Sequence, residues 1–438
     1  MQTVRKSEAL VAVVLGVAAL VAGIQLTNPV NGAITPAGTI TTSAVNVSAG
    51  WNRTWGGTAN EFGMGVWSNG SSFYTCGNTY SFGAGITDLV LVKWNGNGDQ
   101  VWNKTWGDAN ANIGNSVWGS GTAIYTCGYS FVVSKYELLL VKWDNDGNQI
   151  WNRTFGGSLP SNGRSVWTDG TSIYTGGELD NGSNYLDVLL VKWDADGNQL
   201  WNSTWGGTGY DFCNSVRGNG TTDIYTCGST ASFGAEGSSD FLLVKWDTDG
   251  NQIWNRTWGY GGGDEAYSLW IDGPSIYVCG TGYWGYDYYY GTTTDIVLLK
   301  YRVNGGLSFN VTYGGNASDA ANAVVSTSSA IYTFGYTSIN DSNEFILVQW
   351  DLAGNPLGNI TWGGTGADNG NALWTDGTSI FACGDTDSFG AGGSDMAIFK
   401  WTLPSTVLGI DLVPFLVLAA VSAIAFLAIK LERARGVS

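Results

Sequence analysis

The sequence predicts an all-β fold, a seven-bladed β-propeller of four-stranded antiparallel blades spanning 51–403. An Asn-x-Thr triplet in a tryptophan-rich segment recurs seven times, at intervals of 51, 49, 50, 53, 55 and 49 residues. Each repeat holds four short segments with the composition of β-strands, and helical periodicity is absent between the two ends of the chain. A unit of about 50 residues with four strands cannot bury its own faces and must stack on its neighbours.

The four segments are clearest in the third repeat. In chain order they read WNRTF (151–155), RSVWT (164–168), SIYTGG (172–177) and DVLLVKW (187–193). Each is short, rich in β-branched and aromatic residues, and bounded by Gly, Asn or Asp. The last segment is apolar almost throughout, which is typical of a strand covered on both faces. A parallel β-helix would need shorter repeats, and separate domains would need linkers between them.

The segments at the two ends predict how the ring closes. The chain enters the repeats with WNRTW at Trp51 and leaves them after DMAIFKW, which ends at Trp401. The first repeat therefore has one strand to spare and the last repeat lacks one. We expect the N-terminal strand to complete the last blade, which removes the open sheet edges.

The N-terminal end has the pattern of an export signal. Residues 8–24 form an apolar run, and Arg5 and Lys6 precede it. A basic start followed by an apolar stretch and small residues is typical of a signal peptide. Residues 1–33 are therefore predicted to be a signal peptide or an uncleaved N-terminal anchor, and 34–50 a linker.

The C-terminal end predicts a membrane anchor. Residues 412–429 are almost entirely apolar and long enough to cross a bilayer. Lys430, Arg433 and Arg435 follow, and basic residues stay on the cytoplasmic side. We expect 404–438 to form a single-pass transmembrane helix with a short basic tail, which leaves the propeller on the extracellular face of the cell membrane.

Composition excludes several classes of function. The formal net charge is −17, which argues against nucleic acid as a partner, because neutralising phosphates requires clustered Lys and Arg. The chain contains no histidine, so serine–histidine and cysteine–histidine catalysis are excluded and the usual zinc ligand is missing. We predict no catalytic residues, no metal site and no resident cofactor.

Five of the six cysteines occupy one place in successive repeats, in the phrase YTCG or a variant: Cys76, Cys127, Cys227, Cys279 and Cys383. Equivalent places in neighbouring repeats are too far apart for a disulfide. Gly176 and Phe334 take this place in the other two repeats, which indicates a buried packing position. A disulfide between Cys213 and Cys227, which share a repeat, is the alternative.

An acidic turn follows the apolar strand in several repeats. It reads DNDGN at 144–148, DADGN at 194–198 and DTDGN at 247–251. A calcium loop of the EF-hand type needs glycine at the sixth position and glutamate at the twelfth, whereas here the glycine is fourth. Asp, Asn and Gly are also the residues that tight hairpin turns favour. We favour a hairpin turn, with a weak Ca²⁺ site as the alternative.

An acid opens the apolar strand of every repeat, and a lysine follows later in all but one. The acids are Asp88, Glu137, Asp187, Asp240, Asp295, Glu344 and Asp395. The lysines are Lys93, Lys142, Lys192, Lys245, Lys300 and Lys400, with Gln349 in the sixth repeat. Cation binding by a ring of carboxylates is one reading. We favour a scaffold in which each acid orders a loop and each lysine pairs with the neighbouring blade.

Thirteen Asn-x-Ser/Thr triplets are potential N-glycosylation sites in an exported protein. Seven lie in the outermost strand, at Asn52, Asn103, Asn152, Asn202, Asn255, Asn310 and Asn359. The others are Asn46, Asn69, Asn181, Asn219, Asn316 and Asn340. Strand alternation places the Asn and Thr on one face and the tryptophans on the other. A polar ladder between blades is the alternative explanation for the strand triplets.

The connections between strands differ on the two rims of the ring. Turns such as TDGTS and DADGN are short, and the opposite rim carries longer and more varied loops, where recognition usually concentrates. The most unusual is 281–294, whose aromatic residues are Tyr283, Trp284, Tyr286, Tyr288, Tyr289 and Tyr290. We predict a ligand-binding surface there, or rings that pave the channel mouth. Three SFGAG-like loops, at Phe82, Phe233 and Phe389, are expected to be folded connectors.

The phrases DVLLVKWDADGNQLWNSTWGG and YSLWIDGPSIYVCG resemble the seven-bladed β-propeller (SBBP) repeat family of bacterial and archaeal surface proteins. The resemblance covers about 51–401 and implies the fold but no common activity. The C-terminal end is similar to archaeal sorting tails, with VLGID in place of the usual Pro-Gly-Phe. The D-x-x-G-x-x-x-W phrase also resembles pyrroloquinoline-quinone dehydrogenases, whose eight blades and adjacent cysteine pair do not fit.

These observations predict a non-enzymatic, membrane-anchored surface protein that binds a cell-surface glycan or protein through its long-loop rim and carries N-glycans. A structural component of the cell envelope is the first alternative. A propeller enzyme, either quinoprotein-like or a carboxylate-dependent lyase, is the second.

Overall fold

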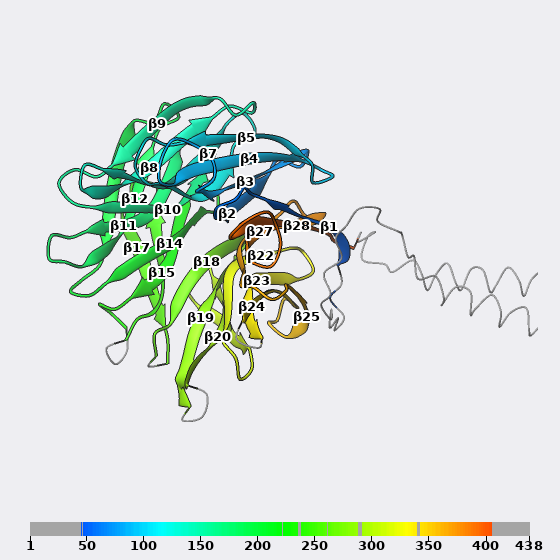
Figure 1. The fold of residues 1–438 in the computed structure, drawn as a ribbon. Coiled ribbons are helices and arrows are strands. Elements are labelled where there is room, and N and C mark those ends of the chain that lie inside the picture. The colour runs from blue at the N-terminus through cyan, green and yellow to red at the C-terminus, as the bar shows by residue number, and fades with distance from the viewer. Residues whose placement is uncertain are drawn as a thin grey trace, which may run out of the picture. The chain divides into compact units, whose positions relative to one another are not determined.

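The computed structural model describes residue 45 and residues 47–404, without 221, 235–237, 261, 288–290 and 340–341. The predicted signal segment and all but the first residue of the predicted anchor lie outside this part of the chain. Within it, no helix is long and apolar enough to cross a membrane. The described residues form seven four-stranded antiparallel sheets, the blades of a β-propeller (Figure 1).

The strands of each blade follow chain order from the centre outward. Blade 1 consists of β2 (Glu61–Ser68), β3 (Ser72–Thr79), β4 (Asp88–Asn95) and β5 (Gln100–Trp106). Blade 2 has β6 (Asn112–Gly119), β7 (Ile124–Val132), β8 (Lys135–Trp143) and β9 (Gln149–Phe155). Blade 3 has β10 (Ser161–Thr168), β11 (Ile173–Asp180), β12 (Leu186–Trp193) and β13 (Gln199–Trp205). Blade 4 has β14 (Asp211–Gly218), β15 (Asp223–Thr230), β16 (Asp240–Asp247) and β17 (Gln252–Trp258).

Blade 5 has β18 (Glu265–Asp272), β19 (Ser275–Asp287), β20 (Gly291–Arg302) and β21 (Leu307–Tyr313). Blade 6 has β22 (Asp319–Ser326), β23 (Ile331–Ile339), β24 (Ser342–Trp350) and β25 (Pro356–Trp362). Blade 7 has β26 (Asp368–Thr375), β27 (Ser379–Thr386), β28 (Asp395–Thr402) and, outermost, β1 (Ser48–Trp55).

The N-terminal strand closes the ring, as the sequence predicts. β1 pairs antiparallel with β28, with Asn52 opposite Phe399 and Thr54 opposite Ala397. β1 begins at Ser48, so the ring takes in the end of the predicted linker. Each innermost strand also contacts the next one around the ring, including β26 with β2. The innermost strands therefore surround a central channel.

Each apolar third strand is buried on both faces, which confirms the prediction from its composition. In β8, residues 138–141 are all fully buried. Leu139 packs with Leu91 of blade 1 on one side, and Leu140 packs with Leu189 of blade 3 on the other. The hydrophobic core is thus a series of layers between blades, and each layer needs both neighbours.

A buried hydrogen bond joins the second and third strands in five of the described blades. In blade 3 the Trp193 indole Nε1–H donates to Thr175 Oγ1 at 3.0 Å. The same bond forms in four other blades: Trp94 donates to Thr75, Trp143 to Thr126, Trp246 to Thr226 and Trp350 to Thr333. In blade 5, Tyr301 and Val278 occupy the two places. The threonine of the YTCG phrase therefore satisfies a buried donor.

The six cysteines are all buried free thiols, so the alternative disulfide between Cys213 and Cys227 is wrong. Burial raises the pKa of each thiol. The prediction of a packing position is confirmed, and the structure explains the exception at Gly176. A Cβ added there would lie 2.8 Å from the Sγ of Cys213 in the next blade, which occupies the space instead.

The acidic segments form hairpin turns, as favoured from the sequence. In the third repeat Asp194 Oδ1 accepts the backbone N–H of Asp196 at 2.9 Å and of Asn198 at 2.8 Å. Its Oδ2 accepts the Asn198 side-chain amide at 2.8 Å. Gly197 has a φ of 80°, the left-handed conformation that such a turn requires. Both carboxylate oxygens are engaged by protein donors, and Ca²⁺ binding stays an untested alternative.

Most of the repeated lysines and several of the acids have the predicted scaffold roles. Asp88 accepts the backbone N–H of Gly85 at 3.0 Å, and Asp395 accepts that of Ala391 at 2.8 Å, so each of these two acids orders the loop before its strand. Five of the lysines donate to a backbone carbonyl in the turn of the next blade, at 2.8–3.3 Å. They are Lys93, Lys142, Lys192, Lys300 and Lys400. Lys245 instead pairs with Asp223 of its own blade at 3.0 Å.

Candidate functional site

The long-loop rim carries the exposed aromatic side chains of the described residues. This rim consists of the loops between the second and third strands of each blade and those that lead to the next blade. The aromatic residues range from 36% exposed for Tyr283 to 59% for Tyr260. They are Tyr80, Phe82, Tyr136, Tyr185, Tyr210, Phe233, Tyr260 and Tyr283. Aromatic faces with polar tips at this density are typical of recognition surfaces.

The three SFGAG-like loops are folded connectors, as predicted. Phe82, Phe233 and Phe389 each place a ring against the last aromatic residue of an outermost strand. The ring centroids lie 5.3 Å from Trp55, 4.9 Å from Trp205 and 4.5 Å from Trp362 respectively. Phe82 and Phe233 remain about half exposed, at 42% and 53%, so these loops also contribute to the aromatic surface.

Residues 281–287 and 291–294 of the tyrosine-rich segment belong to the two strands of the long β19–β20 hairpin (Figure 1). Tyr286 pairs with Thr292 across this hairpin. Tyr283 is partly exposed, and its backbone N–H donates to Asp264 Oδ1 at 3.0 Å. The structure does not describe Tyr288, Tyr289 and Tyr290, nor the side chains of Trp284 and Tyr286. Ligand binding by this cluster therefore stays a prediction.

A groove lies between blades 4 and 5, where the long-loop rim meets the outermost strands β17 and β21. Its volume is about 540 Å³, and its lining includes Phe233, Trp258, Tyr260 and Leu307. The rings of Trp258 and Tyr260 meet edge to face, with centroids 5.1 Å apart. Asn310, a potential glycosylation site, also lines this groove. The groove is wide enough for a sugar residue or a peptide side chain.

The mouth of the central channel is polar and differs from blade to blade. Each innermost strand has a β-bulge, and the bulged residue faces the channel. These residues are Met64, Asn115, Arg164, Asn214, Tyr267, Asn322 and Asn371. The four asparagines donate to a backbone carbonyl of the next blade, as Asn115 does to Gly163 at 2.8 Å. The bulge thus joins blades and aims a variable side chain at the axis.

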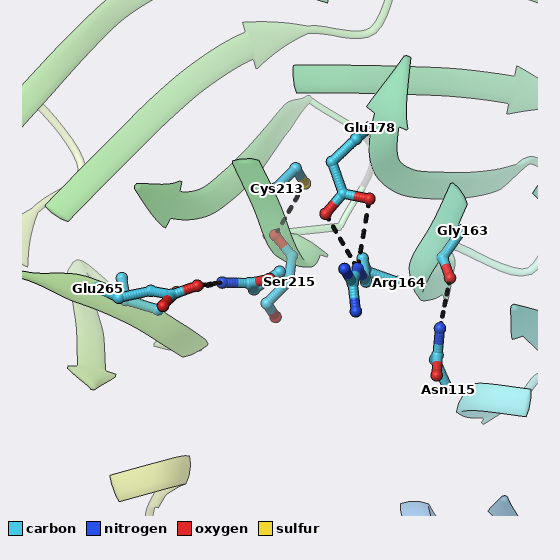
Figure 2. A network of polar contacts seen from close by, with 9 residues as sticks. Asn115, Gly163, Arg164, Glu178, Cys213, Ser215 and Glu265 are labelled. Atoms are coloured by element: carbon cyan, nitrogen blue, oxygen red, sulfur yellow. Dashed lines mark hydrogen bonds and ion pairs between the residues drawn. The ribbon is translucent and has the colours of Figure 1, made fainter. Parts of the chain in front are cut away.

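Two charged groups at the channel mouth lie in blades 3 and 5. Arg164 Nε donates to Glu178 Oε1 at 2.9 Å and Oε2 at 3.3 Å (Figure 2). Burial raises the pKa of Glu178 to about 7, and Arg164 opposes this shift. Glu265 accepts the Asn214 amide at 3.2 Å and the Tyr267 hydroxyl at 3.2 Å. In the view of Figure 2, Glu265 lies on one side of Ser215, and the pair of Arg164 and Glu178 lies on the other.

Pairs of carboxylates bracket the first glycine of the WGG phrase at the long-loop rim. A Cβ on Gly206 would lie 2.6 Å from Asp187 Oδ1 and 2.8 Å from Asp211 Oδ2. Burial, and then the neighbouring Asp211, raise the pKa of Asp187. The same arrangement recurs at Gly56, Gly259, Gly314 and Gly363. Among the described residues, no His, Cys, Asp or Glu side chains form a group of three suited to a metal ion.

The potential glycosylation sites differ in accessibility. Seven of the described sites are exposed, namely Asn52, Asn69, Asn103, Asn202, Asn219, Asn310 and Asn316. Four are partly buried, namely Asn152, Asn181, Asn255 and Asn359. The side-chain amides of Asn181, Asn219 and Asn359 donate to Asp187, Asp223 and Tyr313. Asn46 and Asn340 lie outside the described residues. The predicted alternation is confirmed in β13, where Asn202 and Thr204 face solvent.

The fold and this rim define the chain as a seven-bladed β-propeller. No family model matches the chain, and no curated protein matches it, so the SBBP resemblance and the sorting-tail resemblance stay predictions.

Among solved structures it is similar to the WD40 β-propeller domain of Doa1, with 11% identity and a TM-score of 0.52, covering 82% of this chain and 98% of that chain. Sqt1 from Chaetomium thermophilum matches with 11% identity and a TM-score of 0.43, covering 82% and 100%. Drosophila Plexin A in complex with Semaphorin 1b matches with 8% identity and a TM-score of 0.47, covering 81% and 87%. The likeness to Doa1 shows the fold alone.

Sequence reasoning directed attention to one loop and missed most of the rim and the channel. Tyr185, Tyr210 and Tyr260 occur singly in loops of ordinary composition, and only the ring brings them to one face. The channel residues have a sequence signal, since the residue between two small residues is Asn in four repeats and Met, Arg or Tyr in the other three, as in GNS, GMG and GRS. We read that residue as part of a strand, whereas the structure makes it a bulge.

Proposed function

We propose that this protein is a non-enzymatic binding module of the cell surface, which recognises a glycan or a protein ligand through its long-loop rim. It is exported and held by the C-terminal anchor, and it carries N-glycans on its exposed triplets. One observation supports the proposed binding role. The exposed aromatic side chains of the described residues lie on this rim, and none lies on the short-turn rim.

A ring of seven blades is suited to this role because its scaffold is rigid and its loops are free to vary. The two middle strands of each blade are buried between its neighbours, so substitutions in the loops leave the core intact. Aromatic rings bury large areas with few rotatable bonds, which favours them in glycan and protein recognition. The groove at Tyr260 gives this rim an aromatic hollow.

Export and anchoring rest on the apolar runs at 8–24 and 412–429 and on the many potential glycosylation sites. We expect glycans at exposed sites such as Asn103 and Asn202, and unmodified side chains at Asn181 and Asn359. The amide nitrogen that would carry the sugar is engaged in the protein at the latter two. Peptide mapping of the native protein by mass spectrometry tests this order of occupancy.

The test of binding uses the purified full-length chain on an array of polysaccharides and glycans, with calcium and with a chelator. We expect saturable binding that falls at least tenfold in the double variant Phe233→Ala, Tyr260→Ala. The matched control is Ile253→Ala, which removes an exposed side chain, 51% accessible, from the outermost strand of the same blade. Binding that both variants retain equally would contradict recognition by this groove, and the absence of binding in either buffer would contradict a glycan ligand.

A structural role in the envelope is the second candidate. The outermost strands carry exposed aliphatic residues at one repeated place, namely Val101, Ile150, Leu200, Ile253 and Leu357. This place lies two residues before the triplet asparagine and on the same face of the strand. Bare strands of this kind would favour lateral association. Sedimentation of deglycosylated protein distinguishes the roles, since a structural component assembles without added ligand.

A further inference from the structure

We propose that the floor of the central channel is a binding site for one small oxyanion, a carboxylate, held by the guanidinium of Arg217. Arg217 follows Ser215 and Val216 on its innermost strand, and each blade has an equivalent place after a small residue and a Val or Leu. The seven residues in this place are Trp67, Trp118, Trp167, Arg217, Trp270, Val325 and Trp374. The site is distinct from the aromatic groove and does not depend on the proposed function.

Arg217 lies within a cluster of tryptophans. Its Cζ is 3.9 Å from the ring centroid of Trp118 and 5.8 Å from that of Trp270. Trp374 completes the cluster, with ring centroids 4.6 Å from Trp118 and 5.4 Å from Trp270. The rings attract the guanidinium through cation–π contacts and limit its access to water. The edge of the guanidinium is left to interact with whatever occupies the channel.

The guanidinium has no protein counterion in the described part of the chain. The ion pairs there join Lys135 to Glu137, Arg164 to Glu178 and Lys245 to Asp223. No described side chain or carbonyl accepts a hydrogen bond from Arg217, and its Nε atom is inaccessible to solvent and without a partner. Arg217 is partly buried as a residue, and a guanidinium with little access to water and no protein partner is unfavourable. A bound anion supplies that partner.

Arg217 remains cationic at neutral pH in this environment. Burial lowers the pKa of Arg217 to about 9, which is still above 7. The repeat itself shows that packing does not require an arginine here, since five of the seven copies place a tryptophan at the same point. A residue that carries charge into this cluster is therefore explained by what it binds.

The cavity beside Arg217 has the size and the donors for a small anion. Its volume is about 90 Å³, and its lining includes Ser116, Ser165, Ser215 and Ser268. The hydroxyls of Ser116 and Ser165 accept backbone N–H groups of Val166 and Val216 at 3.2 and 3.1 Å. Their O–H groups are left to donate into the cavity. By the same measure of volume a water needs about 10–15 Å³, so the cavity has room for several waters or one carboxylate.

The planar fork of the guanidinium matches the two oxygens of a carboxylate. The test is therefore isothermal titration of the full-length chain with sodium acetate at pH 7 and constant ionic strength, with inorganic phosphate as a second arm. We expect one saturable acetate site per chain, and dissociation constants at least tenfold weaker for Arg217→Met and for Arg217→Trp, which restores the residue of the other repeats. The control Arg153→Met, on an outermost strand, should bind as the wild type does.

A second measurement needs no variant. We expect the thermal unfolding midpoint of the wild type to rise with acetate but not with a matched amount of sodium perchlorate. The proposal is overturned if the wild type shows neither a saturable site nor this rise, which would leave Arg217 a packing residue. Equal acetate binding by the wild type and Arg217→Met also overturns the proposal. So does a loss of binding in Arg164→Met alone, because that result would place the anion at the channel mouth. Phosphate binding without acetate binding excludes the carboxylate.

Discussion

Replacing Glu178 by glutamine should remove a large part of the pH dependence of stability. The carboxyl of Glu178 is buried, and burial raises its pKa from 4.5 to about 7 against the opposing effect of Arg164. Between these values the folded protein keeps a proton that the unfolded chain has released. Stability from this group is therefore fully present below about pH 4.5 and is lost as the pH rises through 7. The difference of about 2.5 pKa units corresponds to about 3 kcal/mol.

The assay is urea unfolding followed by tryptophan fluorescence at pH 5 and pH 8. About 2.5 kcal/mol of the Glu178 contribution falls within this range. We expect the wild-type free energy of unfolding to drop between the two pH values by about that much more than that of Glu178→Gln. The variant keeps an oxygen that can accept from Arg164, so the fold should persist.

Other carboxyls set the background against which this difference is measured. The pKa values of Asp264, Asp319, Asp368 and Asp385 are also raised, in each case by burial first, so both proteins should lose stability with rising pH. The control Asp194→Asn should leave the difference between pH 5 and pH 8 unchanged, because the side-chain amide of Asn198 lowers the pKa of Asp194, so this carboxyl stays ionised throughout the range. An equal loss of stability in the wild type and in Glu178→Gln would refute a buried carboxyl that titrates near neutrality.

Three further predictions concern the scaffold. In the native protein a thiol reagent should label none of the six buried cysteines, whose pKa values burial raises, and should label all six in urea, by mass spectrometry. Thr175→Val should lower the free energy of unfolding by about 1–3 kcal/mol, because the Trp193 indole N–H loses its buried acceptor, whereas the exposed Thr204→Val should have little effect in the same urea titration. A chain lacking β1 should expose the edge of β28 and elute from gel filtration as oligomers; a stable monomer would contradict closure by this strand.

The fold could be predicted because every blade repeats the same local pattern. Four features recur with little change: the apolar strand, the acid before it, the Asp-x-x-Gly turn and the tryptophan strand. The secondary structure inferred for one repeat therefore holds for all seven. Closure followed from counting strands at the two ends. These are properties of neighbouring residues in the chain, and the interblade core then follows from burial of both faces of each third strand.

The candidate site could be predicted only in part, because it depends on geometry between repeats. The bulge at Arg164 arises from the register between β10 and β11, and no pattern within RSVWT distinguishes it from a regular strand. The rim tyrosines come from separate loops, and their exposure depends on how each loop folds. Tyr210, for example, stacks on Phe212 with centroids 6.0 Å apart while staying 45% exposed.

The positions at which the seven copies agree and those at which they differ separate scaffold from function. Most of the repeated polar residues have a partner that recurs in other copies: an acid with its own loop, a lysine with the next turn, a tryptophan with a threonine. A ligand on the axis meets all seven copies at once, and a symmetric ring would hold it equally well in seven orientations. A single orientation requires that the copies differ where they face the axis. Arg164, Tyr267 and Arg217 are such differences, and they lie in one channel, which is why we place specific recognition on the axis and on the rim around it.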